Sequence, residues 1–171
     1  MNKNPVSEEL LDVVDESDQV VGVKPRGEIH AKGLMHRAVH ILVFNDQKQL
    51  FIQKRAMNKD ENPGLWDSSA AGHVDSGEDY LSCAIRELDE ELDITVTSPL
   101  QFLFQLPPQP ANGMEHSAVY TYVDNGPFRL QKEEIDDGSW ITNEQMNQRV
   151  EMDDPSLTRV LCQIWQRFQA I

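Results

Sequence analysis

The sequence predicts an α/β or α+β sandwich, in which helices cover both faces of a mixed β-sheet. Two observations support this fold class. Short apolar runs with strand composition recur along the 171 residues, and segments with helical periodicity lie between and after them. No internal repeat or low-complexity segment interrupts this order, so the elements are expected to bury one shared core.

Strands are predicted where short runs are apolar or β-branched and turn residues bound them. In chain order these segments are residues 9–15, 19–24, 36–45, 49–54, 66–72, 94–106, 117–124 and 137–141. The turn at residues 16–18 predicts that the first two strands form a hairpin. Residues 62–64 have turn composition, and three prolines within residues 107–110 predict an exposed loop near the mouth of a site.

Helices are predicted where apolar residues recur at three- and four-residue spacing. Residues 26–32 indicate a short helix or a turn, residues 142–149 a helix with Thr142 as its N-cap, and residues 156–170 an amphipathic helix. The helix predicted over residues 79–92 has the clearest apolar stripe. Its members are Leu81, Ala84, Ile85, Leu88 and Leu92, which are expected to face the core.

Length and composition predict a single domain over residues 1–171, with residues 1–35 as a hairpin extension packed on it. No apolar stretch approaches the roughly 18 residues of a membrane span. Residues 1–5 lack the apolar segment of a secretory signal, so a cytoplasmic protein is expected. Cys83 and Cys162 lie in apolar helical patterns and are expected to be buried, reduced thiols.

The net charge of −14 argues against nucleic acid or a membrane surface as a partner. It is compatible with a small anionic substrate if divalent cations neutralise the site locally. The basic residues Lys54, Arg55 and Lys59 form one compact group in the sequence. Strands at the edge of the sheet would allow a homodimer, without direct support in the sequence.

Three glutamates on the helix predicted over residues 79–92 suggest a metal site. Glu87, Glu90 and Glu91 share one face at i, i+3 and i+4 spacing. Like charges at this spacing repel by about 0.2–0.5 kcal/mol per pair. A hard divalent cation with oxygen ligands would reverse that penalty. A solvated acidic helix face would also gather three glutamates, so the surrounding pattern has to decide between the two interpretations.

A long string of fixed spacing surrounds these glutamates, and it resembles the signature of the Nudix hydrolases, G-x5-E-x7-R-E-U-x-E-E-x-G-U, where U is a bulky aliphatic residue. The matching residues are Gly72, Glu78, Arg86, Glu87, Leu88, Glu90, Glu91 and Ile94. The chain departs from the signature at Asp93, where the family has a glycine that ends the helix in the left-handed conformation. Asp tolerates that conformation better than most residues, so the metal ligands are expected to be kept.

The resemblance implies a Nudix-type α/β/α sandwich with a mixed sheet and the signature loop and helix. It also implies metal-dependent hydrolysis of a diphosphate joined to a second group, by attack of water on phosphorus. Mg²⁺ or Mn²⁺ suits all-oxygen ligands and bridging to phosphate. Glu87 and Glu91 would be the principal ligands, Glu90 a further one, and the Gly72 carbonyl would complete the set.

The resemblance further implies supporting roles in catalysis and binding. Arg86 would form a bidentate pair with Glu78 that holds the ligands in place. Some family members take the general base from the signature, which points to Glu91, and others take it from a later loop. Glu134 is the loop candidate here, and a solvated carboxylate is the alternative.

Arg55 and Lys54 are candidate substrate-binding residues. Neighbouring residues of a strand point to opposite faces, so only one of the two is expected to reach the substrate. Arg55 is the preferred phosphate contact, and a solvated position is the alternative.

Four further segments resemble the isopentenyl diphosphate isomerase branch of the Nudix fold, which isomerises an allylic diphosphate. They are residues 35–45, 53–56, 62–67 and 71–74. That branch has a Cys where this chain has Ala71, and a methyl group cannot transfer a proton. The branch also has a second metal site of histidines and glutamates. Its approximate counterparts here are His30, His36, His73 and Glu115, for which satisfied polar residues are the alternative interpretation.

The favoured function is a metal-dependent pyrophosphohydrolase that acts on a small nucleoside-diphosphate-type substrate. An isomerase-like enzyme and a non-catalytic ligand-binding module are the alternatives. Loop residues 107–116 are expected to recognise the group attached to the diphosphate. Four aromatic residues would either stack on a base or belong to the core: Trp66, Phe104, Tyr120 and Trp140.

Overall fold

The computed structural model describes residues 9–171. Its strands are β1 Leu10–Val14, β2 Val20–Pro25, β3 His36–Phe44, β4 Leu50–Arg55, β5 Trp66–Asp67, β6 Ala70–His73, β7 Gln101–Leu106, β8 Glu115–Val123 and β9 Ile135–Ile141. Its helices are α1 Arg26–Lys32, α2 Tyr80–Leu92, the 3₁₀ helix η2 Pro110–Asn112, α3 Asn143–Glu151 and α4 Arg159–Gln169. The expectation that residues 1–5 lack a signal segment lies outside the described residues, as do residues 1–8 of the expected extension.

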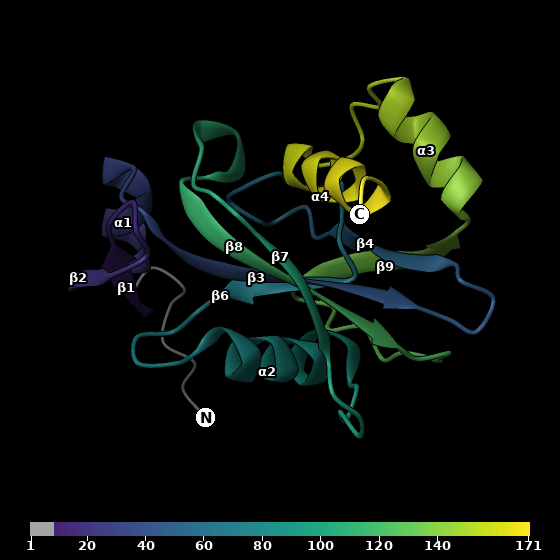
Figure 1. Cartoon of the computed structure of the whole chain (residues 1–171), viewed down its shortest axis with the longest axis horizontal. Helices are drawn as coiled ribbons and strands as arrows, with labels where there is room; N and C mark the ends of the chain where they lie inside the picture. The colour runs from purple at the N-terminus through teal and green to yellow at the C-terminus, as the bar shows by residue number, and fades with distance from the viewer. Residues whose placement is uncertain (1–8) are drawn as a thin grey trace.

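A mixed sheet separates two layers of helices, with α2 on one face and α3 and α4 on the other (Figure 1). Within the described chain this sheet has seven strands, in the order β5-β4-β3-β8-β7, with β6 paired to β3 and β9 paired to β4. β3 and β8 run parallel, and the other pairs are antiparallel. The predicted sandwich with a mixed sheet is confirmed.

The sheet divides between β3 and β4. These strands pair only at Phe44 and Leu50 and then diverge. β6 continues the ladder on β3, from Ala70 opposite Ile41 to His73 opposite Ala38. In the part of the chain that the structure describes, the other edge of β6 pairs with no strand. The division therefore leaves backbone groups of β6 available to side chains from α2.

Ser68 and Ser69 explain why residues 66–72 form two short strands rather than the single strand predicted. The Ser69 hydroxyl accepts a hydrogen bond from the Val43 N–H at 2.8 Å and donates to the Phe51 carbonyl at 2.5 Å. Ser69 thus bridges β3 and β4 where their own ladder ends. The strand predicted over residues 94–106 is also shorter and begins at Gln101, after a proline at position 99 that cannot donate to a ladder.

The two faces of β3 pack into two hydrophobic clusters. Val39, Ile41 and Val43 face the α2 side, where Ala84, Leu88 and Leu92 are fully buried. Leu42 belongs to the cluster on the other face, with Leu161, Ile164 and Trp165 of α4. Successive side chains of a strand alternate between faces, so the even-numbered residues of β3 face α4.

The predicted apolar stripe of α2 is correct for Ala84, Leu88 and Leu92 and wrong for Leu81 and Ile85, which are 47% and 39% exposed. Cys83, Glu87 and Glu91 are buried in their place. The helix is rotated so that its carboxylates meet β6 instead of solvent. Periodicity alone could not show this, because it treats a buried glutamate as a polar surface residue.

Both ends of α2 follow the sequence prediction. Asp79 is the N-cap, and its carboxylate accepts a hydrogen bond from the Ser82 N–H at 2.7 Å. Asp93 takes the left-handed conformation at φ 57°, and its N–H donates to the Asp89 carbonyl at 3.0 Å. Asp93 therefore ends the helix as a glycine would.

The predicted β1–β2 hairpin is present as a separate two-stranded sheet. It is joined to the main sheet region by hydrogen bonds from the Val14 N–H to the Met35 carbonyl and from the Ser76 N–H to the Leu10 carbonyl, both 3.0 Å.

Both cysteines are free, and Cys162 is only half-buried, in contrast to the expectation. None of the helices among residues 9–171 is long and apolar enough to cross a membrane.

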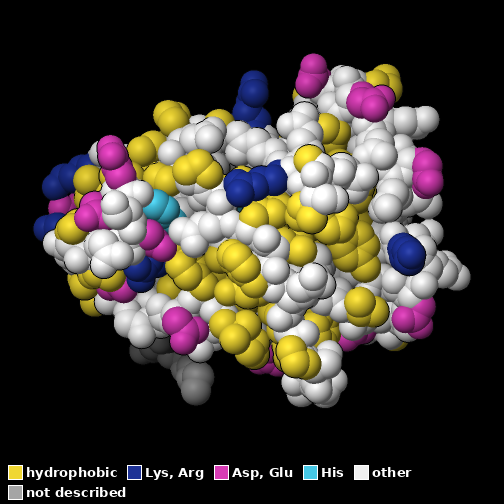
Figure 2. Space-filling view, viewed as in Figure 1, with side chains coloured by type: hydrophobic (Ala, Val, Ile, Leu, Met, Phe, Trp, Pro, Cys, Tyr) yellow, Lys and Arg dark blue, Asp and Glu magenta, His cyan; other side chains and the backbone are white. Residues whose placement is uncertain are grey.

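Figure 2 shows hydrophobic side chains gathered over the middle of the face that carries β7 and α4, with charged side chains around them. Phe102 of the edge strand β7 is 53% exposed. A homodimer formed through an edge strand stays a prediction.

Candidate active site

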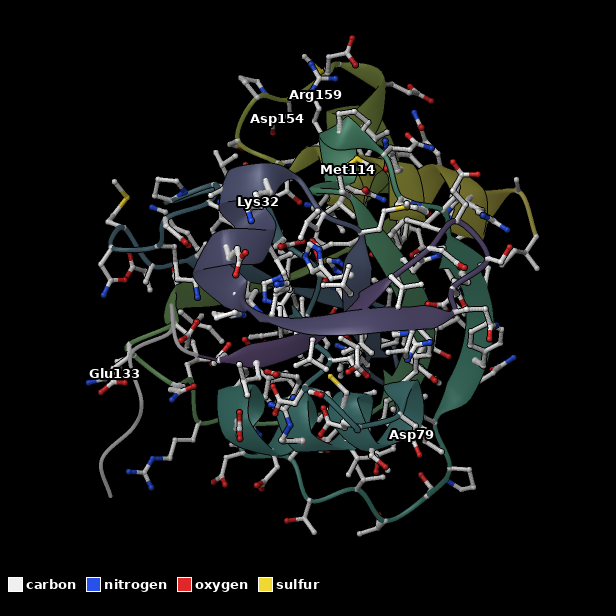
Figure 3. The ribbon with its side chains drawn as sticks, turned by 90° about the vertical axis from the view of Figure 1, so that its left-hand side faces the viewer. Lys32, Asp79, Met114, Glu133, Asp154 and Arg159 are labelled. Carbon is white, nitrogen blue, oxygen red and sulfur yellow. The ribbon has the colours of Figure 1, made fainter. Side chains whose placement is uncertain are left out.

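A cleft of about 1640 Å³ opens where the sheet divides. Its lining comes from β3, β4, β6, α2, the η2 loop and α4, and includes Glu87, Glu91, Gln53, His40, Asn112 and Gln163. Three residues of this lining are labelled in Figure 3, with Glu133 at the lower left and Asp154 and Arg159 at the top of the view. The proline-rich loop predicted to lie near a site mouth is part of the lining.

Two glutamates of α2 meet the backbone of β6 at its unpaired edge. Glu91 Oε1 accepts hydrogen bonds from the Ala71 N–H at 2.8 Å and from Gln53 Nε2 at 3.2 Å. Glu87 lies directly against Gly72, since a Cβ added to that glycine would be 2.2 Å from Glu87 Oε1. The carboxylates of Glu87 and Glu91 therefore both lie against a short backbone segment, Ala71 and Gly72, whose side chains are small or absent.

Burial raises the pKa of both carboxyl groups. It raises the pKa of Glu91 to about 8, and hydrogen bonds from Ala71 and Gln53 partly offset the effect. The pKa of Glu87 is raised by burial and then by the charge of Glu91, against the opposing effect of Arg86. The ionised forms of Glu87 and Glu91 are therefore unfavourable at these buried positions unless a bound cation compensates their charge.

Arg86 connects the residues of the signature. Its Nε and Nη2 donate to the two carboxylate oxygens of Glu78, each at 2.9 Å, as the predicted bidentate pair. Its Nη1 donates to Glu87 Oε1 at 2.8 Å and to Glu90 Oε2 at 3.3 Å. Nη2 also donates to the His73 carbonyl at 3.2 Å. Arg86 thereby holds Glu87 in place, whereas Glu90 keeps a half-exposed side chain at the rim.

The basic group of residues 54–59 is divided by the strand. Arg55 and Lys59 line the cleft, and Lys54 does not. Lys54 and Arg55 are neighbours on β4, so they point to opposite faces. The structure therefore does not support Lys54 as a substrate contact, and Lys59 takes its place. Lys59 Nζ pairs with the carboxylate of Glu134, which also lines the cleft and raises the pKa of Glu91 through its charge.

A second cluster lies beside Gly72 and contains the three histidines predicted as metal ligands. The ring centroids of His30, His36 and His73 are 5.1–5.4 Å apart. Glu115 Oε2 is 3.6 Å from His73 Nε2 and 3.9 Å from His36 Nε2. The parallel pairing of β3 with β8 places His36 directly opposite Glu115. The structure thus brings all four predicted residues together.

The histidines of this cluster differ in which ring nitrogen carries the proton, and therefore in which nitrogen could bind a cation. His36 Nδ1 is 2.9 Å from the Leu34 carbonyl and must donate to it, which leaves Nε2 as a buried acceptor without a partner among the described residues. Arg26 Nε instead donates to His73 Nδ1 at 3.4 Å, so His73 carries its proton on Nε2. Burial lowers the pKa of His36 to about 4 and raises the pKa of Glu115 to about 8.

No Phe, Tyr or Trp within residues 9–171 lines the cleft. Phe104 and Tyr120 are 6% and 7% exposed and belong to the hydrophobic clusters. Trp66 and Trp140 pack against those clusters. The structure therefore supports the core alternative for all four aromatic residues proposed to stack on a base.

Two further polar residues, Gln53 and His40, line the cleft and were not singled out from the sequence. Gln53 bridges the Ser69 carbonyl and Glu91. His40 is 4% exposed, and burial lowers its pKa despite the nearby charge of Asp67. Strand alternation was the available signal, because His40 is four residues after His36 and shares its face.

Comparison with known proteins identifies the family. Residues 34–161, which carry this cleft and α2, match the NUDIX domain. The chain belongs to the Nudix hydrolase family. An uncharacterized Nudix hydrolase of Pseudomonas aeruginosa is 40% identical over 139 residues, covering 80% of each chain. The uncharacterized Nudix hydrolase YfcD of Escherichia coli K12 is 32% identical over 167 residues, covering 96% of this chain and 90% of its own.

A solved structure supports the fold. DR0079 from Deinococcus radiodurans is 28% identical and has a TM-score of 0.83, covering 93% of this chain and 98% of that chain. As a Nudix hydrolase, the protein is a pyrophosphohydrolase, and enzymes of this family generally need divalent metal ions.

Proposed function

We propose that this Nudix hydrolase uses Mg²⁺ or Mn²⁺ to cleave the diphosphate linkage of a small nucleoside-diphosphate-type substrate, with water attacking phosphorus. The observation that carries the proposal is the meeting of Glu87, Glu91 and Gly72 at the edge of β6. Bound there, the ion would neutralise the carboxylates and polarise the diphosphate.

The residues fit a hard cation. In both Glu87 and Glu91, Oε1 receives the protein donors, Arg86 for the first and Ala71 and Gln53 for the second. Oε2 of each has no hydrogen-bond partner in the described part of the chain. Each buried carboxylate therefore has one oxygen that the protein orients and one that is available as a ligand.

The remaining side chains supply orientation and charge. The Arg86–Glu78 pair prevents Glu87 from turning away from β6. Glu134 is the proposed acceptor of the proton from the attacking water. Arg55 and Lys59 line the same cleft and would bind non-bridging phosphate oxygens. Binding of the substrate would then release Glu134 from its pair with Lys59.

A screen of diphosphate compounds with Mg²⁺ and with Mn²⁺ tests the proposal. The set includes nucleoside diphosphates, nucleoside diphosphate sugars, dinucleotides and prenyl diphosphates. Hydrolysis in ¹⁸O-labelled water is expected to place the label in a phosphate product, because water attacks phosphorus. Label in the alcohol product, or turnover that persists in excess EDTA, would contradict the mechanism.

In the absence of divalent ions, the free energy of unfolding is expected to fall as the pH rises from about 6.5 to about 8. Glu91 has a pKa of about 8 in the folded state against 4.5 ordinarily, and Glu115 is shifted in the same direction. The folded protein therefore binds more protons than the unfolded chain over this interval. The contribution of these two carboxyl groups is fully present below about pH 4.5 and is lost as the pH rises through about 8. Below about pH 6.5 the lowered pKa of His36 has the opposite effect, so the interval above it isolates the carboxyl groups.

Thermal unfolding in EDTA at about pH 6.5 and about pH 8 measures this effect. Mg²⁺ is expected to raise the melting temperature more at pH 8 than at pH 6.5, since the ion competes with protons for the carboxylates. Glu91→Gln is the matched control and should weaken both dependences. A metal-free melting temperature that increases with pH over this interval would speak against the buried carboxylates.

A second candidate function, an isomerase-like enzyme, is favoured by the cluster of His30, His36, His73 and Glu115. These residues lie together as the resemblance to the isomerase branch implies. Two observations oppose it. Ala71 offers no proton, and the donor contact from Arg26 occupies the nitrogen of His73 that must be protonated when the other binds a metal.

The native protein is expected not to interconvert isopentenyl and dimethylallyl diphosphate with Mg²⁺ or Mn²⁺, as followed by proton NMR. Ala71→Cys tests whether the rest of an isomerase site is present, and Ala71→Ser is the control without a thiol. Isomerisation by the native protein would overturn the hydrolase assignment.

A further inference from the structure

The buried His40 has one ring nitrogen engaged and one free. Its Nδ1 is 2.7 Å from the Ser68 hydroxyl oxygen. Its Nε2 has no hydrogen-bond partner within the described residues. Unlike the unpartnered Nε2 of His36, it is not sealed from solvent, and His40 lines the cleft. His40 therefore presents Nε2 to whatever occupies the cleft.

The neighbours of His40 determine where its proton resides. The Ser68 hydroxyl donates its one proton to the Ala70 carbonyl at 3.4 Å. With the Ser68 proton directed to Ala70, the Ser68 oxygen accepts from His40 and Nδ1 carries the hydrogen. Asp67 Oδ1, 3.9 Å from Nδ1, favours the same tautomer through its charge. In the neutral ring, Nε2 is left as a bare acceptor directed into the cleft.

His40 lies between the end of the cleft that carries Glu87 and Glu91 and the end that α4 lines. It is directly opposite Ala71 in the β3–β6 ladder, and Ala71 binds Glu91. On the same face of β3, the next residue inward, Leu42, packs with α4. A substrate with its diphosphate at Glu87 and Glu91 would therefore extend its second group past His40 towards α4.

The α4 end of the cleft is suited to hydroxyl groups. Arg159, Gln163 and Gln166 line it from one face of α4, at i, i+4 and i+7. Their side chains have no hydrogen-bond partners among the described residues, so their donors and acceptors are available. The absence of Phe, Tyr and Trp from the described lining removes the usual platform for a stacked base or a prenyl chain.

We infer that His40 is a specificity-determining residue whose Nε2 accepts a hydrogen bond from a hydroxyl group of the substrate, and that the group attached to the diphosphate is a polyol or sugar. This inference rests on the proposed function for the placement of the diphosphate. A protic group is required because a bare imidazole nitrogen repels phosphate oxygens and gains nothing from hydrocarbon. A polyol has hydroxyl groups that can donate to His40 Nε2 and others that can form hydrogen bonds with the side chains of α4.

Two non-hydrolysable ligands with the same carbon skeleton test the inference. They are the methylenediphosphonate monoesters of glycerol and of propanol, which differ only in the hydroxyl groups. Calorimetry with Mg²⁺ is expected to show the glycerol ligand binding at least about tenfold more tightly, because the propyl ligand leaves His40 unpaired. In His40→Phe the two affinities should agree within about twofold.

His116→Gln is the matched control. His116 is also 4% exposed, but its Nε2 donates to the Asp15 carbonyl and it does not line this cleft. This variant should keep the preference for the glycerol ligand.

If His40→Phe does not fold, ¹⁵N NMR of histidine in the native protein tests the inference instead. The signal of the unprotonated Nε2 of His40 should shift with the glycerol ligand and not with the propyl ligand.

The outcomes separate this inference from the proposed function. Equal binding or no binding of the two ligands by the native protein, or a preference that survives in His40→Phe, would overturn the inference even if ordinary diphosphates are hydrolysed with Mg²⁺. The expected preference without any Mg²⁺-dependent hydrolysis would sustain the inference and reject the proposed function.

Discussion

Replacing Glu91 by Gln is expected to lower Mg²⁺-dependent release of phosphorylated product at least ~100-fold, with the fold intact. The amide oxygen of Gln can still accept from the Ala71 N–H, so the contact between α2 and β6 survives. What is lost is the negative charge that would hold the ion. Steady-state turnover, together with the melting temperature of each variant, measures the effect.

Glu90→Gln is the matched control for this experiment. Glu90 lies on the same helix, but its side chain is 52% exposed and its contact with Arg86 is longer, at 3.3 Å. Its loss is therefore expected to reduce turnover less than the loss of Glu91. Unchanged turnover in Glu91→Gln would remove the argument for a metal at this site.

Replacing Gly72 by Ala is expected to impair both activity and stability. The added Cβ would lie 2.2 Å from Glu87 Oε1 and 2.3 Å from its Cδ, so the carboxylate has to move. A displacement of about 1 Å at a reacting centre can reduce turnover about 100-fold. Crowding in a packed region costs about 1–3 kcal/mol of unfolding free energy. Turnover and denaturant unfolding measure the two effects separately.

Gly22→Ala is the control for this substitution. Gly22 lies in β2, and a Cβ there would have nothing within 4 Å. Its effect on the free energy of unfolding is expected to stay within about 0.5 kcal/mol, with turnover unchanged. A tolerated Gly72→Ala would show that Glu87 is free to move and would weaken its proposed role as a ligand.

Local sequence signals predicted α2 well. Its bounds to within one residue, its left-handed end at Asp93 and the pairing of Arg86 with Glu78 all depend on residues within about two helical turns of one another. Such short-range geometry follows from helical periodicity and capping chemistry. The positions of most strands along the chain were also predictable, because each has its own apolar run, although residues 66–72 form two strands where one was predicted.

Signals that depend on distant segments were harder to interpret. Leu81 and Ile85 looked like core residues, yet α2 turns them outward because Glu87 and Glu91 meet β6. Strand alternation predicted that only one of Lys54 and Arg55 would reach the substrate, and in the paired strand β4 it is Arg55 that lines the cleft. His40 was given no role from the sequence, and its importance depends on Ser68, which is far from it in the chain.

The sequence by itself determined the family, the signature carboxylates and the boundaries of the helix that carries them, since these depend on spacing along one element. Only the tertiary structure decided which side chains share a cleft: Glu91 with Ala71 and Gln53, and His36 with Glu115. The physical reason is that these contacts join strands and helices that are remote in the chain. Their register is set by sheet pairing and core packing rather than by any local pattern.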